Sequence, residues 1–251
     1  MIGSSPRKSS ALGRPVLVVA LDVCELLTAR ALVAALAPLG VWFKLGLEPL
    51  FAFGDLLRDE LAAAGANLFI DAKLFDIPRT VEAAVRALVR PGVRMIDVHA
   101  LGGDAMMRAA VAGAAERAAE LGIEPPQIFA VTILTSTGDE SLGELGLRGG
   151  IGENVMRLAA LARDARCAGV IASPRETHDL KAFFGRDFAV LCPGIRPSGS
   201  AHGDQVRVAT PRDAVLAGAD YLVVGRPILE AADPVAATRA ILAEIESAFA
   251  T

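Results

Sequence analysis

Residues 67–76 read NLFIDAKLFD, a short apolar run that ends among charged side chains, and this pattern recurs along the chain. Short apolar runs alternate with longer helical patterns, and we expect strands at Val16–Asp22, Val41–Gly46, Asn67–Leu74, Met95–Ala100, Gln127–Leu134, Gly169–Ser173, Ala189–Ile195 and Tyr221–Gly225. Strict alternation of strands and helices implies a mostly parallel sheet. Eight such units in 251 residues fit a closed (β/α)8 TIM barrel, an α/β fold with a single domain.

An open, doubly wound sheet is the alternative fold for the same alternation. Such a sheet usually has a glycine-rich turn after its first strand, whereas Asp22 is followed here by Val23 and Cys24. Because no linker interrupts the pattern, we expect residues 14–251 to form the barrel and the Ser-rich residues 1–13 to form a flexible N-terminal tail. Two long Gly/Ser-rich segments, 135–152 and 197–209, follow expected strands and suit mobile lids.

Composition excludes several classes of protein. The formal net charge of −4 argues against a general nucleic-acid binder, which would carry a basic field. No apolar run approaches the roughly 20 residues of a membrane-spanning helix. The cysteines Cys24, Cys167 and Cys192 are odd in number and far apart, so we expect neither a disulfide framework nor a metal cage. Reduced thiols of this kind favour a cytoplasmic location.

Polar residues gather where the expected strands end, which is where barrels of this type place their active sites. They are Asp22, Lys44, Asp71, Lys73, Asp76, Asp97, His99, Thr132, Thr135, Arg196 and Arg226. Metal ligation is disfavoured, because the carboxylates lie near lysines and no pair of histidines has ligand spacing. His99 fits either an acid–base role or a hydrogen-bonded core position that orients Asp97.

The pair Asp71 and Lys73 carries the strongest chemical signal. Residues two apart on a strand share a face, and charges buried among apolar neighbours are costly unless they are paired. A salt bridge that caps the barrel is the structural interpretation. The functional one is that an ammonium held between carboxylates stays protonated. Lys73 then suits donation of a proton to a carbon base better than nucleophilic attack by a neutral amine.

A phosphate site is predicted beside this charged pair. The segment 223–227 (VVGRP) follows the last expected strand, where barrels often bind phosphate through backbone N–H groups. Arg226 adds a bidentate donor, and Arg196 ends the neighbouring segment 192–196 (CPGIR). Either arginine alone would be interpreted as a rim salt bridge, but two at adjacent strand ends beside glycines favour an anion pocket.

Taken together, these motifs resemble the orotidine 5′-phosphate decarboxylase family from about residue 15 to residue 230. The motifs are LD (21–22), FKLG (43–46), DAKLFDIPRT (71–80), VTILTS (131–136), PGIR (193–196), GDQ (203–205) and VVGRPI (223–228). The resemblance implies a homodimeric barrel lyase that needs no cofactor and no metal. It implies conversion of orotidine 5′-phosphate to UMP and CO₂ in pyrimidine synthesis, with no nucleic-acid or membrane partner.

The resemblance also implies a role for each matching residue. Lys73 is expected to protonate C6 of the pyrimidine, and Asp71 to lie beside the departing carboxylate. Asp76 is expected to reach the partner's site, with Ile77 and Thr80 nearby. The remaining expected contacts are Asp22 and Lys44 with the ribose, Thr135 and Pro193 with the base, and Arg196, Gln205, Gly225 and Arg226 with the phosphate, Gln205 also touching the base. Phe75 stands where many family members have histidine.

Two other functions stay open at this point. Sugar-phosphate aldolases and decarboxylases of related barrels share the D-x-K-x-x-D pattern but use Mg²⁺ to stabilise an enediolate. The GDQ and LTS motifs argue against that group. The second alternative is a nucleotide-binding barrel without catalysis, and the intact Asp71, Lys73 and Asp76 argue against it.

Overall fold

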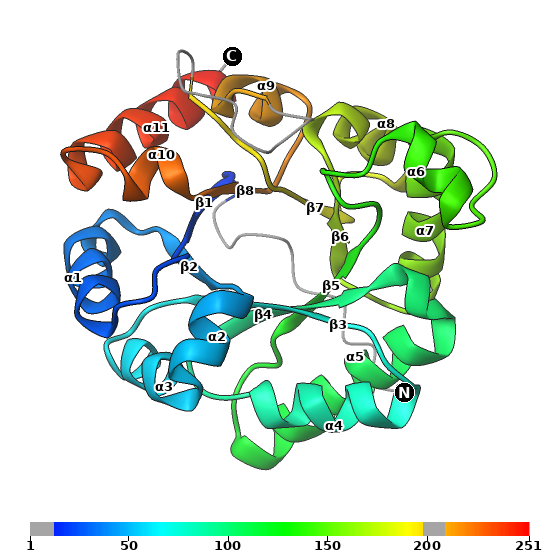
Figure 1. Cartoon of the computed structure of the whole chain (residues 1–251), viewed down its shortest axis with the longest axis horizontal. Helices are drawn as coiled ribbons and strands as arrows, with labels where there is room; N and C mark the ends of the chain where they lie inside the picture. Colours follow the sequence, from blue (N-terminus) through cyan, green and yellow to red (C-terminus); the bar gives the residue numbers. More distant parts are fainter. Residues whose placement is uncertain (1–12, 198–208, 251) are drawn as a thin grey trace.

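The computed structural model describes residues 13–197 and 209–250, and it forms a closed barrel of parallel strands in the order β1 to β8 (Figure 1). The strands are β1 (Val16–Ala20), β2 (Trp42–Leu45), β3 (Leu68–Leu74), β4 (Val93–His99), β5 (Gln127–Val131), β6 (Gly169–Ile171), β7 (Ala189–Cys192) and β8 (Tyr221–Val224). The barrel closes where β1 pairs with β8. The predicted fold is confirmed, and each expected strand overlaps an observed one.

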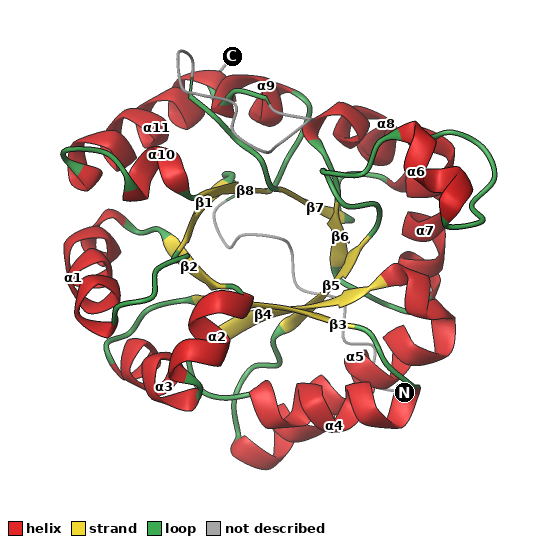
Figure 2. Cartoon of the chain, in the orientation of Figure 1, coloured by secondary structure: helices red, strands yellow, loops and turns green. Residues whose placement is uncertain are grey.

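Helices form the outer ring around the barrel (Figure 2). They are α1 (Leu26–Leu36), α2 (Leu47–Phe53), α3 (Asp55–Ala63), α4 (Pro78–Leu88), α5 (Gly103–Leu121), α6 (Asp139–Glu144), α7 (Ile151–Asp164), α8 (Pro174–Phe184), α9 (Pro211–Leu216), α10 (Arg226–Leu229) and α11 (Pro234–Phe249), with short 3₁₀ turns at Ala37–Leu39 and Ala100–Gly102. Helices α8, α9 and α11 each begin with proline after a capping side chain, from Ser173, Thr210 and Asp233. Proline suits this position because its missing N–H would have no helical partner there.

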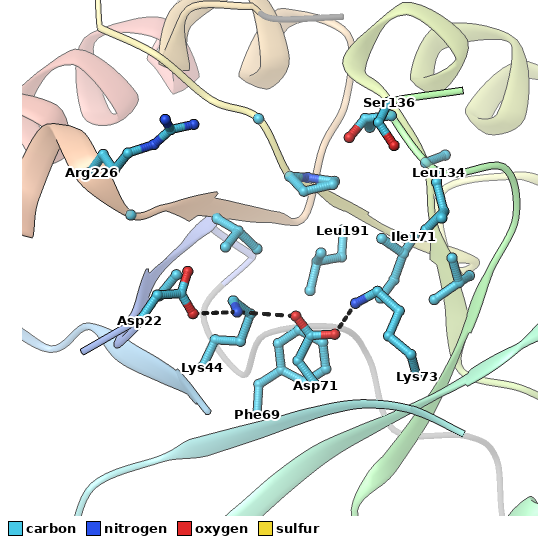
Figure 3. Close-up of a pocket in the computed structure, with 18 of the residues that line it drawn as sticks. Asp22, Lys44, Phe69, Asp71, Lys73, Leu134, Ser136, Ile171, Leu191 and Arg226 are labelled. Carbon is cyan, nitrogen blue, oxygen red and sulfur yellow. Dashed lines mark hydrogen bonds and ion pairs between the residues drawn. The ribbon is translucent and has the colours of Figure 1, made fainter. Parts of the chain in front are cut away.

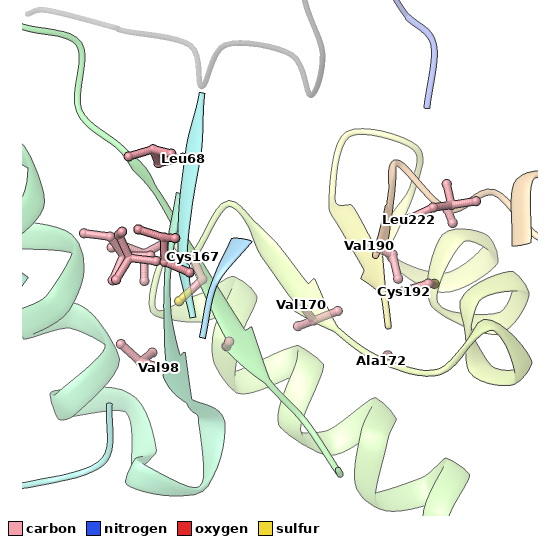
Figure 4. Packing of buried hydrophobic residues seen from close by; sticks show 14 of the residues in the cluster. Leu68, Val98, Cys167, Val170, Ala172, Val190, Cys192 and Leu222 are labelled. Atoms are coloured by element: carbon pink, nitrogen blue, oxygen red, sulfur yellow. The ribbon is translucent and has the colours of Figure 1, made fainter. Parts of the chain in front are cut away.

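Alternation along each strand divides the core into two layers. Inward-facing residues such as Val18, Met95 and Phe129 fill the barrel interior, while their neighbours in sequence pack against the surrounding helices. Cys167 and Cys192 lie in this outer apolar layer (Figure 4). Burial of both faces explains why the strands are continuous apolar runs. On β3 the inward positions after Phe69 are Asp71 and Lys73, so the alternation that fills the core also delivers charge to the barrel mouth.

The structure differs from the sequence expectations mainly at strand ends. Strand β5 ends at Val131, three residues before the expected Leu134, because the chain turns to line the cavity described below. The segment 135–152, expected to be a loop, contains the short helix α6. Residues 1–12 of the expected tail and most of the expected 197–209 lid lie outside the described residues. In the described part of the chain, no helix is long and apolar enough to cross a membrane.

Candidate active site

A cavity of about 600 Å³ opens at the carboxyl ends of the strands. Its lining comes from most of the strand ends and includes Asp22, Lys44, Asp71, Lys73, Thr135, Ser136, Pro193, Arg196, Gly225 and Arg226. This volume lies in the range of roughly 300–1,000 Å³ that is typical of small-molecule sites. Residues that are more than 200 positions apart in the sequence thus share one site, because parallel strands end on the same side of the barrel.

Four charged side chains form an alternating row across this cavity, in the order Asp22, Lys44, Asp71 and Lys73 (Figure 3). The Nζ atom of Lys44 lies 3.1 Å from Asp22 Oδ1 and 3.1 Å from Asp71 Oδ2. The other carboxylate oxygen of Asp71 accepts from Lys73 Nζ. Each inner charge therefore has an opposite charge on both sides, which offsets the cost of removing it from water.

Gly46 leaves the space that the side chains of Lys44 and Asp22 occupy. A Cβ atom at Gly46, directly after β2, would lie 2.7 Å from Lys44 Nζ and 3.1 Å from Asp22 Oδ1. A side chain there would push Lys44 away from its carboxylate partners. The FKLG motif therefore contributes both a charge and the space that this charge occupies.

Electrostatics keep the two lysines protonated. Burial by itself would lower the pKa of Lys44, but Asp71 and Asp22 outweigh it and raise the pKa. The pKa of Lys73 is likewise raised, because Asp97 and Asp71 outweigh the effect of burial. Burial acts in the opposite direction on Asp71, yet Lys44 and Lys73 hold the pKa of this carboxyl well below its usual range. The predicted state of an ammonium between carboxylates is therefore the one that the geometry favours.

The structure also adds Asp97 to this network, a residue to which the sequence analysis assigned no role of its own. Asp97 lies on β4, is fully buried, and accepts a hydrogen bond of 2.8 Å from the backbone N–H of Lys73. Its Oδ2 atom lies 3.3 Å from Lys73 Nζ. The sequence did carry a signal for Asp97, because a charged residue stands on the inward face of the strand next to β3. The strand register that brings Asp97 to Lys73 exists only in the folded barrel.

Two arginines also line the cavity. In Figure 3 the guanidinium of Arg226 extends over the cavity from the start of α10, away from the charged row. Arg196 follows β7 and is 9% exposed, and its Nη1 atom donates to the carbonyl of Ile195. Gly225 and Pro193 line the cavity as well. The cavity thus combines a row of paired charges with two guanidinium groups.

Other predicted residues lie elsewhere in this single chain. Thr135 lines the cavity beside Ser136, as expected for a contact residue. Asp76, Ile77 and Thr80 are exposed and do not line the cavity, and Asp76 Oδ1 accepts from the Ile77 N–H at 2.6 Å. Gln205 lies outside the described residues.

The fold and this cavity define a single-domain (β/α)8 barrel whose mouth combines a row of paired charges with two arginines. Within the described ranges, no group of three or more His, Cys, Asp or Glu residues is arranged to hold a metal ion. His99 lies beside the network, and burial together with Lys73 lowers its pKa, so that neutral imidazole is favoured there.

Comparison with known proteins identifies the family. Residues 15–241 match the model of the orotidine 5′-phosphate decarboxylase / HUMPS family, and the chain belongs to this family. An orotidine 5′-phosphate decarboxylase from Moorella thermoacetica is 49% identical over 92% of each chain. One from Paramagnetospirillum magneticum is 45% identical over 90% of this chain and 97% of its own. The crystal structure of the Lactobacillus acidophilus enzyme of that name has a TM-score of 0.82 and 37% identity, over 92% of this chain and 99% of its own.

Proposed function

We propose that this protein decarboxylates orotidine 5′-phosphate to UMP and CO₂ in de novo pyrimidine synthesis, using its own side chains and no cofactor. The observation that carries the proposal is the row Asp22–Lys44–Asp71–Lys73 in a cavity that also contains Arg196 and Arg226. Relatives that are named orotidine 5′-phosphate decarboxylase match nearly the whole chain. The family model also covers HUMPS proteins, and an assay with orotidine 5′-phosphate distinguishes the two groups.

In the proposed reaction, Lys73 supplies the proton. The bond between C6 and the carboxylate breaks, CO₂ leaves, and the electron pair stays on C6 as a carbanion with little delocalisation. A preorganised ammonium stabilises this developing charge before it transfers a proton to C6. Asp71 and Lys44 support this role, because they belong to the paired row that keeps Lys73 charged and directed at the cavity. Asp71 is also proposed to lie beside the departing carboxylate.

The rest of the substrate would hold the reacting ring in place. We assign the phosphate to Arg226, Arg196 and Gly225, with Gln205 as a further contact to phosphate and base, and the ribose to Asp22 and Lys44. Thr135 and Pro193 would contact the base. Binding energy from the phosphate, which does not react, is available to order the charged row and exclude water.

We propose a homodimer in which Asp76 acts in the partner's site, with Ile77 and Thr80 near it. This proposal is supported by the surface that surrounds Asp76, where Phe75 is 60% exposed and Ile77 is 65% exposed. Large apolar side chains at this level of exposure, next to a strand end that carries catalytic candidates, favour contact with another protein surface. Phe75 would then pack within the interface rather than touch the substrate.

We also propose a cytoplasmic location. The described cysteines are free thiols, with Cys167 and Cys192 both buried. Free thiols are stable in a reducing compartment. Immunodetection of the native protein in fractionated cells tests this assignment.

The reaction is tested with purified, EDTA-treated protein and orotidine 5′-phosphate, by following the loss of substrate absorbance together with CO₂ release. We expect full turnover with chelator present. Turnover that needs added Mg²⁺, or that occurs with a sugar phosphate instead, would support the aldolase-type alternative. Binding of UMP without any turnover would support a nucleotide-binding barrel.

A further inference from the structure

The backbone of Lys73 has an unusual conformation for a strand residue. Its φ angle is +50°, and among the described residues only Arg166 is another non-glycine with a positive φ. L side chains rarely adopt this left-handed region, so surrounding contacts must hold the residue there. A positive φ at a residue of proposed chemical function is therefore a feature that needs a structural cause.

The cause lies in the pairing of β3 with β4. Ile70 is opposite Ile96, but Leu74 is opposite Val98, so four steps along β3 match two along β4. The additional residues of β3 form a bulge that includes Asp71 and Lys73. A bulge interrupts the ladder of backbone hydrogen bonds and changes the direction of side chains. Its backbone N–H groups then need other acceptors.

Asp97 provides that acceptor. It stands on β4 between the two register positions, and its Oδ1 atom accepts the Lys73 backbone N–H at 2.8 Å. Its Oδ2 atom is 3.3 Å from the ammonium of the same lysine. One carboxyl group therefore contacts both the backbone and the side-chain end of Lys73. Asp97 is fully buried and does not line the cavity, so its effect on the cavity must pass through the residues that it contacts, Lys73 among them.

We propose that Asp97 is a positioning residue, which holds Lys73 in the left-handed bulge and fixes the direction of its ammonium. This inference rests on the proposed function, in which Lys73 protonates C6. The proposed phosphate ligands Arg196 and Arg226 follow β7 and β8, on strands other than the one that carries the bulge. The loss of Asp97 should therefore affect the chemical step and leave binding nearly intact.

The hydrogen bond from the Lys73 backbone N–H to Asp97 can be tested separately from the negative charge of the carboxyl group. Burial and the neighbouring Asp71 raise the pKa of Asp97, so the negative charge of this pair is carried by Asp71. An amide oxygen in Asp97→Asn can still accept the Lys73 N–H. Asp97→Ala removes both contacts. The conservative variant should therefore rescue most of the rate.

The test compares Asp97→Ala and Asp97→Asn with Met95→Ala, a control that removes a fully buried side chain two residues earlier on the same inward face of β4. We expect Asp97→Ala to lower kcat at least about 100-fold with KM and the Kd of UMP changed less than about threefold. Asp97→Asn should stay within about tenfold of the parent, and Met95→Ala should lose thermal stability but keep its kcat. If Asp97→Ala fails to fold, Asp97→Val replaces it, because valine fills more of the space and has no side-chain acceptor.

A second readout does not depend on turnover. Trace acetylation followed by peptide mass spectrometry compares Lys73 with Lys44 in the same sample. We expect Asp97→Ala to raise the Lys73/Lys44 labelling ratio at least about fivefold, since Lys73 loses the contacts that hold its ammonium against the Asp71 carboxylate. An unchanged ratio, a parental kcat in Asp97→Ala, or an Asn variant as impaired as the Ala variant overturns the inference. If the parent protein does not decarboxylate orotidine 5′-phosphate, the proposed function fails, and the labelling ratio still decides the position of Lys73.

Discussion

Lys44 Nζ lies 3.1 Å from Asp71 Oδ2, and this contact joins β2 to β3 inside the barrel mouth. Because Lys44 also contacts Asp22, and Asp71 also contacts Lys73, the pair couples two ends of one charged row. The charge state of each member depends on its neighbours, as the opposite pKa shifts of Lys44 and Asp71 indicate. Substitutions in this row should therefore affect function more than the loss of one ordinary ion pair.

Replacing Lys73, the proposed proton donor, should abolish decarboxylation while the protein stays folded. We expect Lys73→Ala to reduce kcat by at least about 10³-fold, since it removes both a general acid and an electrostatic stabiliser. Lys181→Ala is the matched control, because Lys181 also pairs with a partly buried aspartate, Asp220, away from the cavity. The kcat of each variant is measured beside its circular dichroism spectrum. Substantial turnover in Lys73→Ala would exclude the assigned role.

Removing the proposed phosphate ligand should weaken binding of phosphorylated ligands selectively. Charge-assisted hydrogen bonds contribute about 1.5–3 kcal/mol, so Arg226→Ala should raise the Kd of UMP about 10- to 100-fold. Uridine lacks the phosphate, and its weak binding should not change. Isothermal titration calorimetry with both ligands makes the comparison. Equal UMP affinity in variant and parent would show that the phosphate binds elsewhere.

Mixed dimers test whether Asp76 is shared between subunits. We expect Lys73→Ala and Asp76→Ala each to be nearly inactive as pure samples. In a mixed dimer, one site carries both substitutions and the other carries neither, so equal mixing with free exchange should restore about a quarter of the parental sites. Activity is followed after brief dissociation and reassociation, with sedimentation analysis of the oligomer. No recovery in exchanged dimers would mean that Asp76 serves its own chain.

The lysines of the row should titrate at higher pH than a free lysine. Their raised pKa values mean that the folded state binds these protons more tightly than the unfolded chain does. Stability from these groups is therefore complete below about pH 10.4, the unfolded value, and is lost as the pH rises through the folded value. Competitive acetylation against Nα-acetyl-lysine between pH 8 and 12 measures both midpoints. A midpoint for Lys44 or Lys73 below that of the reference compound would contradict the pairing.

The buried thiols should be inert in the folded protein. Burial raises the pKa of Cys167 to about 12 and that of Cys192 to about 12, so only about one in 10⁴ is a thiolate at pH 8. Cys24 is exposed, although its contact with Glu48 raises its pKa as well. We expect a thiol-specific disulfide reagent to label Cys24 in native protein and Cys24, Cys167 and Cys192 after unfolding. Fast native labelling of Cys192 would indicate that the outer core opens.

The local sequence pattern by itself determined the barrel fold and most of the charged row at its mouth. Eight apolar runs separated by helical segments permit few arrangements that bury both faces of every strand, and charges such as Asp71 and Lys73 at strand ends have only the mouth of the barrel in which to meet. Tertiary structure alone decided the contact of Asp97 with Lys73, the left-handed backbone of Lys73 and the exposed position of Asp76. These features depend on the register between strands and on how far each side chain reaches, which spacing within one strand does not specify.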